Sequence, residues 1–264
     1  MTVTVRQVLD YLMEPVGRLE STVDRLSFGR LESEVKGIAT VFIATHEVIE
    51  QAIALGVNLI ITHEGTFYSH LDRTDGLEQD PVYQGKRQLI EASGIAIFRF
   101  HDYFHRYRPD GIMAGLLEAL GWTSFVQDHQ PAASILAIPP MSVRQVAEHM
   151  KQALHIPFVR MAGEEELLCT RIGVLAGYRG GGSTALPLFE KEGLDLVIAG
   201  EGPEWETPEY VKDAVHQGKR KAFILLGHAE SEEPGMEHLA GLLRTQFESV
   251  PVHFLPARRS FQVL

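Results

Sequence analysis

Residues 58–68 read Asn58-Leu59-Ile60-Ile61-Thr62-His63-Glu64-Gly65-Thr66-Phe67-Tyr68. The stretch begins as a short apolar run and ends in two side chains of metal-ligand type, His63 and Glu64. An apolar run of this length bounded by turn residues is typical of a buried β-strand. Open α/β sheets place their sites at the ends of such strands. We therefore expect this strand end to form one part of a functional site.

Composition limits the class of protein. The chain has 264 residues, of which 45% are hydrophobic and 22% are charged, as in soluble globular proteins with a sizeable core. The sequence has no apolar run of membrane-spanning length and no apolar signal-peptide core, so the expected location is the cytoplasm. A net charge of −11 argues against a nucleic-acid partner. The single cysteine, Cys169, excludes an intrachain disulfide and a zinc site built from cysteines.

Apolar runs alternate with segments of helical periodicity along the chain. Strands are predicted at 37–44, 57–62, 95–99, 134–138, 158–161, 171–175, 194–199, 222–226 and 250–255. Helices are predicted at 5–13, 47–55, 85–93, 111–120, 142–154, 184–192, 207–217 and 234–246, and the segment 14–35 is expected to be irregular or extended. This alternation favours an α/β fold with mostly parallel sheets. A change of composition near 126–131 predicts two linked α/β halves, 1–128 and 129–264, or one interlinked unit.

Three of the predicted strands lead directly into residues of ligand type. These residues are His63 with Glu64, His101 with His105, and His228 with Glu232. The last two pairs have i, i+4 spacing, so a helical turn would place both side chains on one face. Any one pair is more often a solvated helix face. Their recurrence after three strands is what favours a metal site.

The ligand types indicate the metal. Imidazole together with carboxylate suits divalent zinc, iron or manganese. About five such ligands can hold two ions roughly 3.5–4 Å apart, with a carboxylate expected to bridge them. Adjacent residues on an extended backbone diverge, which favours His63 and Glu64 each contacting a different ion.

Other segments carry alternatives that the sequence leaves open. The glycines from Gly177 to Ser183 precede a predicted helix, where backbone N–H groups can bind an anion or simply form a tight turn. They lack the Gly-Lys-Ser/Thr ending of a P-loop. Glu201 follows the strand at 194–199 and is a candidate proton shuttle, although a solvated acidic loop explains it equally well. His70 is the best further ligand candidate among the remaining histidines.

These motifs resemble those of the Nif-three-like dinuclear metal-centre family, whose members are often described as GTP cyclohydrolase I type 2. The segment 60–64 resembles that family's strand and paired-histidine motif, with Glu64 at the second histidine. The segment 101–105 resembles its His-Thr-Asn-Leu-Asp motif, with His105 at the aspartate, and 227–232 resembles its Gly-His-Tyr-Ala-Thr/Ser-Glu motif. The segments 173–183 and 195–201 resemble its glycine-rich turn and its Asp-x-x-x-Thr-Gly-Glu strand.

Departures from the family's motifs indicate a divergent branch, beginning with Glu64 and His105 in the places of a histidine and an aspartate. The family's N-terminal Asp-Asn-x-Gly-Leu signature is missing, and Asp24-Arg25-Leu26-Ser27-Phe28-Gly29 stands in that region. The histidine that usually follows the Gly-Glu pair is also absent, with Trp205 and Glu206 nearby.

The resemblance implies a fold, a ligand set and an assembly. The fold would be two linked α/β halves with two divalent metal ions between them. The implied ligands are His63, Glu64, His101, His105, His228 and Glu232. Members of the family typically assemble as hexamers, so a homo-oligomer is expected here.

The leading functional hypothesis is a dinuclear metal-dependent hydrolase. Metal-activated water would attack a small phosphorylated or nucleotide-like substrate, with Glu201 as the candidate shuttle. The alternative is a metal-binding assembly or regulatory protein without turnover. Ring opening of GTP is a further possibility that rests on the family's description alone.

Overall fold

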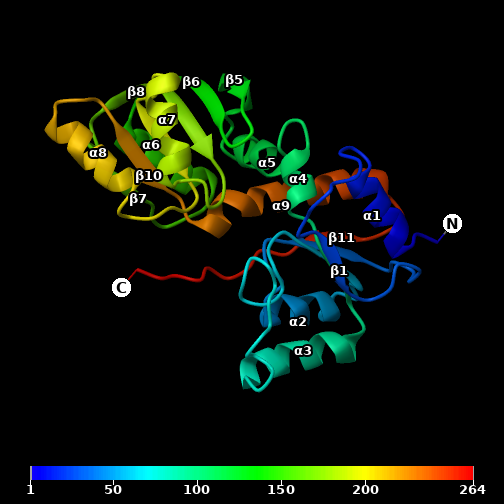
Figure 1. Cartoon of the computed structure of the whole chain (residues 1–264). Helices are drawn as coiled ribbons and strands as arrows, with labels where there is room; N and C mark the ends of the chain where they lie inside the picture. Colours follow the sequence, from blue (N-terminus) through cyan, green and yellow to red (C-terminus); the bar gives the residue numbers. More distant parts are fainter. Residues whose placement is uncertain (1, 264) are drawn as a thin grey trace. The chain divides into compact units, whose positions relative to one another are not determined.

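The computed structural model of the chain describes residues 2–263. The chain divides into two compact units, which Figure 1 shows in sequence colours. Unit 1 comprises the chain up to Gly111 and again from Met236, and unit 2 comprises Ile112–Gly235. These bounds differ from the predicted halves 1–128 and 129–264, whose end residues 1 and 264 lie outside the described residues. The predicted boundary falls inside unit 2, because Val126–His129 forms a strand of that unit's sheet.

Unit 1 is built on a five-stranded sheet in the order β1-β4-β3-β2-β11. The central strands β2 (Ile38–Val41), β3 (Leu59–Thr62) and β4 (Ala96–Arg99) are buried and pair in parallel. At the edges, β11 (Val252–Phe254) pairs in parallel with β2, and β1 (Arg25–Phe28) pairs antiparallel with β4. This sheet is mostly parallel, as the sequence predicts.

The register of the central strands positions the first group of predicted ligands. Val41 pairs with Thr62, and Thr62 pairs with Arg99, so the three strands end at one edge. Because carboxyl ends of parallel strands meet there, the residues after β3 and β4 leave the sheet side by side. A short helix, α4 (Asp102–Arg106), begins soon after β4 and gives His101 and His105 the predicted helical spacing.

The helices of unit 1 bury apolar side chains in the same core as its sheet. Figure 1 shows α2 (His46–Ala54) beside α3 (Pro81–Ser93), and their buried residues join those of the strands in one core cluster. The helix α1 (Val5–Met13) begins with a capping box made by Thr4 and Gln7. The hydroxyl of Thr40 on β2 donates to the carbonyl of Met236 at 2.7 Å, which attaches the C-terminal segment to the sheet.

Unit 2 contains a six-stranded sheet in the order β5-β6-β8-β9-β10-β7. Its central strands β8 (Leu168–Leu175), β9 (Leu196–Ala199) and β10 (Ala222–Leu225) pair in parallel. The outer strands pair antiparallel: β5 (Val126–His129) with β6 (Ser134–Ser142), β6 with β8, and β7 (Arg160–Ala162) with β10. The sheet is therefore mixed, because β5 and β6 are joined by a short turn that leaves no room for a crossover helix.

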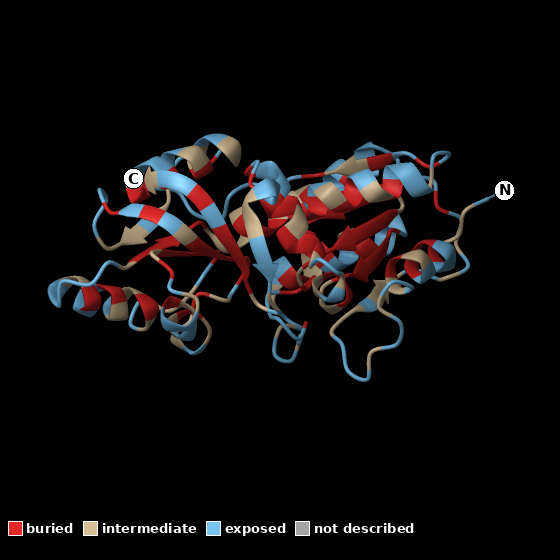
Figure 2. Cartoon of the chain, turned by 90° about the horizontal axis from the view of Figure 1, so that it is seen from above, coloured by how far each residue is buried: buried red, intermediate tan, exposed pale blue. Residues whose placement is uncertain are grey.

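Helices again cover the second sheet, and Figure 2 shows them with one buried and one exposed side. The elements that contact its strands are the 3-10 turn η1 (Thr123–Phe125), α6 (Val143–Ala153), α7 (Gly182–Lys191) and α8 (Thr207–His216). Two more helices, α5 (Gly111–Ala119) and α9 (His228–Gln246), begin in this part of the chain. The helix α9 begins at His228, earlier than the predicted start at 234, and thereby places His228 and Glu232 on one helical turn. Among the described residues, no helix is long and apolar enough to cross a membrane.

Candidate metal centre

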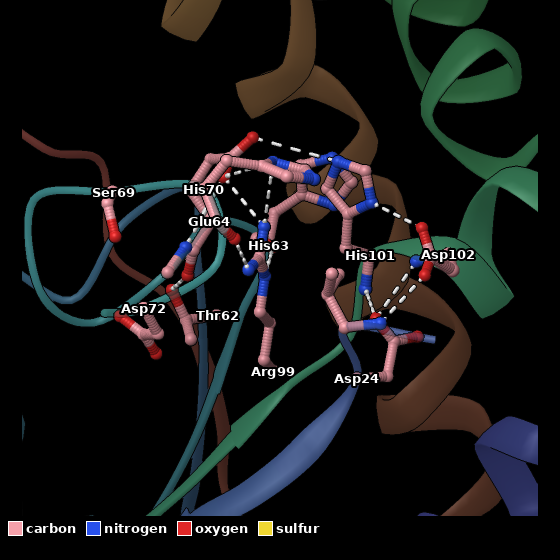
Figure 3. Close-up of polar contacts among 12 residues, drawn as sticks. Asp24, Thr62, His63, Glu64, Ser69, His70, Asp72, Arg99, His101 and Asp102 are labelled. Atoms are coloured by element: carbon pink, nitrogen blue, oxygen red, sulfur yellow. Dashed lines mark hydrogen bonds and ion pairs between the residues drawn. The ribbon is translucent and has the colours of Figure 1, made fainter. Parts of the chain in front are cut away.

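Three histidines of unit 1 converge where β3 and β4 end, and Figure 3 labels two of them, His63 and His101. His63 follows β3 and is fully buried, His101 follows β4, and His105 lies on α4. The rings of His63 and His101 stack with their centroids 4.6 Å apart, and the ring of His105 meets them edge-on at 5.0 Å and 4.9 Å. One ligand-type atom of each histidine lies within 4.8 Å of the others. The structure thus brings together three residues that the sequence singled out.

Each of these histidines has its Nδ1 atom beside an oxygen. The pairs are His63 with the carbonyl of Phe100 at 3.2 Å, His101 with Asp102 Oδ1 at 3.0 Å, and His105 with Asp110 Oδ2 at 2.9 Å. An Nδ1–H group that donates to an oxygen sets the neutral tautomer and presents Nε2 as the ligand atom. Metal-binding histidines are held by the same kind of contact, so this set fits a divalent ion.

The first turn of α4 is held by the carboxylate of Asp24, the residue that precedes β1. His101 occupies its N-cap but makes no side-chain capping bond. Instead, Asp24 Oδ1 accepts the N–H groups of His101 and Asp102 at 2.8 Å and 2.9 Å, and Oδ2 accepts that of Tyr103 at 2.9 Å (Figure 3). A carboxylate here satisfies exposed N–H groups and suits the helix dipole. Asp24 therefore positions the helix that carries two candidate ligands.

Asp102 serves two parts of the site. Its Oδ1 holds His101, and its Oδ2 accepts the N–H of Val23 at 2.8 Å. The hydrogen bond from His101 is the main reason that the pKa of Asp102 lies well below its usual range. Asp102 therefore orients the ring of His101.

Glu64 lies between the histidines and a buried arginine (Figure 3). Arg99, at the end of β4, is 1% exposed, and its Nη2 donates to Glu64 Oε2 at 2.9 Å. The other carboxylate oxygen, Oε1, lies 3.7 Å from His101 Nε2. Arg99 was not among the predicted site residues. The signal was present, because a charged residue that ends an otherwise apolar strand needs a partner once it is buried.

His70 joins this group from the loop between β3 and α3. Its ring centroid lies 5.2 Å from that of His101, and its Nδ1 lies 3.9 Å from Glu64 Oε2 and 3.3 Å from Arg99 Nη2. Burial, followed by the charge of Arg99, lowers the pKa of His70. One ligand-type atom from each of Glu64, His70 and His101 lies within 4.8 Å of the others. His70 was the best additional candidate in the sequence.

Unit 2 holds the remaining predicted ligands. His228 Nδ1 lies 2.9 Å from Glu201 Oε2, and His228 Nε2 lies 3.3 Å from an oxygen of the buried Glu232. This histidine therefore repeats the Nδ1–oxygen arrangement of unit 1. Glu201, the predicted proton shuttle, contacts a predicted ligand, and its catalytic role stays a prediction.

The glycine-rich turn packs closely on this pair. Gly177 has a φ of +67°, and its N–H donates to Ser231 Oγ at 2.9 Å. A Cβ atom added at Gly177 would collide with Glu232 Oε1 and lie 3.4 Å from His228 Nε2. Farther along, the N–H of Gly182 at the start of α7 donates to Glu206 Oε2 at 2.6 Å. Close packing thus explains the glycine at 177. At the start of α7, the carboxylate of Glu206 accepts an N–H group that could otherwise bind an anion.

Comparisons with known proteins agree with this fold. A family model described as Duf34/NIF3 (NGG1p interacting factor 3) matches residues 7–260. The GTP cyclohydrolase 1 type 2 homolog of Clostridium acetobutylicum is 24% identical, with 86% of this chain and 85% of that protein covered. The protein of the same name from Archaeoglobus fulgidus is also 24% identical, with 80% of each covered.

Solved structures show the same architecture. The Staphylococcus aureus hypothetical protein SA1388 superposes with a TM-score of 0.75 at 20% identity, covering 100% of both chains. A Bacillus cereus protein related to NIF3 superposes with a TM-score of 0.75 at 15% identity, again over 100% of both chains. At such identities the likeness concerns the fold.

Proposed function

The chain belongs to the Duf34/NIF3 family, and from this membership and its histidine–carboxylate cluster we propose that it is a metal-dependent hydrolase. The observation that carries the proposal is the arrangement of His63, His101 and His105. Each has Nδ1 beside an oxygen, and the three rings converge. Such a set, with the carboxylate of Glu64, suits zinc, iron or manganese.

The proposed chemistry is hydrolysis of a small phosphorylated or nucleotide-like substrate. A divalent ion, when bound, supplies a Lewis acid that polarises a phosphoryl or carbonyl oxygen and activates water. Phe100, Asp102 and Asp110 keep the imidazoles in one tautomer and orientation. In unit 2, His228 and Glu232 are proposed as ligands, and Glu201, which is 48% exposed, is proposed to exchange a proton with solvent.

The relatives are named GTP cyclohydrolase 1 type 2 homolog, which makes hydrolytic opening of the GTP ring one reaction to test. Two ions per chain and assembly into a hexamer are what the family resemblance implies, and both are proposed here on that basis.

Metal content tests the proposal directly. Protein purified without chelator should contain at least about one equivalent of a first-row divalent metal per chain, or take it up on titration. His101→Ala should lose much of this metal, whereas His46→Ala, which changes a half-exposed histidine on α2, should retain it. Wild-type protein that neither contains nor takes up metal would overturn the proposal.

The alternative function is metal binding for assembly or regulation, without turnover. The ion pair between Glu64 and the buried Arg99 favours this alternative, because such a pair is typical of a structural role for the carboxylate. Metal-loaded protein can be screened with p-nitrophenyl phosphate and with nucleotides that include GTP. Turnover that His228→Ala abolishes supports the hydrolase. Tight nucleotide binding without any product supports the alternative.

A further inference from the structure

The guanidinium of Arg99 is enclosed by acceptors from two segments. Its Nε donates to the carbonyl of His63 at 3.3 Å, and its Nη1 donates to the carbonyl of His70. Its Nη2 donates to Glu64 Oε2 at 2.9 Å. A buried charge is costly unless it is paired and hydrogen-bonded, and these contacts meet both conditions. Arg99 is therefore held in one position, with its charge directed at Glu64.

The two oxygens of Glu64 have different surroundings. Oε2 accepts from Arg99 and also from the N–H of Gly65 at 3.3 Å. Oε1 points toward His101 and lies 3.7 Å from its Nε2. A planar guanidinium that donates to one oxygen fixes the orientation of the carboxylate. The side of Glu64 that faces His101 is thus a single oxygen.

We propose that Arg99 is a positioning residue that limits Glu64 to coordination through Oε1 alone. At an ion held with His101, Glu64 would then supply one carboxylate oxygen beside the imidazole ligands. This contrasts with the expectation from sequence that a carboxylate bridges two ions. The inference rests on the proposed metal binding and deepens it.

The inference also predicts which ions the site prefers. Arg99 cancels the charge of Glu64, so the remaining donors are dominated by neutral imidazole. Imidazole suits zinc, iron and cobalt, whereas magnesium and calcium require several oxygen ligands. The site is therefore expected to take a first-row transition metal and to exclude magnesium.

Glu64→Gln tests whether the two carboxylate oxygens of Glu64 have separate roles, one toward Arg99 and one toward the metal ion. The amide has one oxygen, and Arg99 can only donate, so the oxygen should turn to Arg99 and the NH₂ group toward His101. The ion then loses its oxygen ligand. Titration with Co²⁺, followed by visible absorption, should show binding weaker by at least about tenfold than in wild type. Glu64→Gln should bind Co²⁺ as weakly as Glu64→Ala.

A double variant makes the test specific to Arg99. In Arg99→Met/Glu64→Gln the amide oxygen is released from the guanidinium and can face the histidines. Co²⁺ affinity should therefore recover several-fold, by about threefold or more, over Glu64→Gln alone, with a spectrum closer to wild type. In Arg99→Met alone, both oxygens become available, so the Co²⁺ bands should weaken as coordination number rises. Arg87→Met, which removes an exposed ion pair with Glu91, should leave the spectrum unchanged.

The outcomes separate this inference from the proposed function. If wild type binds no Co²⁺, the proposed metal binding fails and the inference fails with it. If wild type binds and His101→Ala does not, metal binding stands. In that case, a Glu64→Gln variant that binds as wild type, or a double variant no tighter than Glu64→Gln, overturns the role of Arg99. Should the Arg99→Met variants not fold, the comparison of Glu64→Gln with Glu64→Ala decides: tighter binding by Glu64→Gln overturns the inference.

Discussion

Unit 1 contains several buried charged side chains, and Lys86 on α3 is one of them. It is 3% exposed, and its Nζ donates to the carbonyl of Thr66 at 2.5 Å. The same ammonium lies 5.5 Å from the ring centroids of Phe67 and Tyr68. Burial lowers the pKa of Lys86 to about 8, and Asp72 opposes this shift. Lys86 thereby ties the loop after β3 to α3 at the cost of a buried charge.

This pKa predicts how stability depends on pH. Lys86 has its folded pKa lowered from 10.5 to about 8, so between these values the unfolded chain binds more protons. The free energy of unfolding should therefore rise with pH through this window and level off above it. By urea unfolding, wild type should gain on the order of 3 kcal/mol relative to Lys86→Met, at about 1.4 kcal/mol per pKa unit. Parallel stability curves for the two proteins would contradict this account.

At the scale of elements, strand ends and the turns that follow them position the ligands. In unit 1, β3 and β4 end in register, and Asp24 fixes the first turn of α4. In unit 2, Gly177 in the turn after β8 packs so closely against Glu232 of α9 that an added Cβ atom would collide with its carboxylate. The ligands thus depend on close backbone packing as much as on their own side chains.

Gly177→Ala tests that packing. The residue has a positive φ, and a new Cβ would strike Glu232, so both backbone strain and overpacking act. We expect a loss of about 1–3 kcal/mol in the free energy of unfolding and weaker Co²⁺ binding by His228 and Glu232. Urea unfolding and Co²⁺ titration measure the two effects.

Gly241→Ala is the matched control. Gly241 lies in α9, and a Cβ there would meet nothing within 4 Å. Alanine should stabilise the helix by about 0.5–1 kcal/mol. A Gly177→Ala variant that matches this gain would show that the turn does not press on Glu232.

The two units differ in whether one or two segments of the chain form them. Unit 2 is a continuous segment, Ile112–Gly235. Unit 1 needs a second segment, which supplies the edge strand β11 and a helix whose residues Met236, Leu239 and Leu243 are fully buried. Unit 1 is therefore incomplete until the C-terminal part of the chain is present.

Fragments should reveal this difference. The fragment 112–235 should unfold cooperatively by circular dichroism, because its sheet and covering helices are continuous in sequence. The fragment 1–111 should not, because it lacks the apolar face of α9 and the strand β11. Adding a peptide of residues 236–263 should restore cooperative unfolding. A sharp melt by the fragment 1–111 alone would contradict this prediction.

Much of the candidate site follows from the sequence by itself. Apolar runs identify β3 and β4, and the residues just beyond them are His63, Glu64 and His101. The i, i+4 spacing of His101 with His105 requires only that a helical turn follow, and α4 supplies it. These features are local, so periodicity and turn residues within a few positions determine them.

Tertiary structure alone decided the partners. Asp24 reaches His101, and Arg99 reaches Glu64 and His70, across tens of residues. The mixed pairing of the second sheet and the return of β11 to the first are likewise long-range. Each depends on which strands become neighbours, and no local pattern encodes that choice, because many distant segments have the same apolar character. The sequence therefore determined which residues stand at the strand ends, and the packing of the strands decided which charges and acceptors hold them.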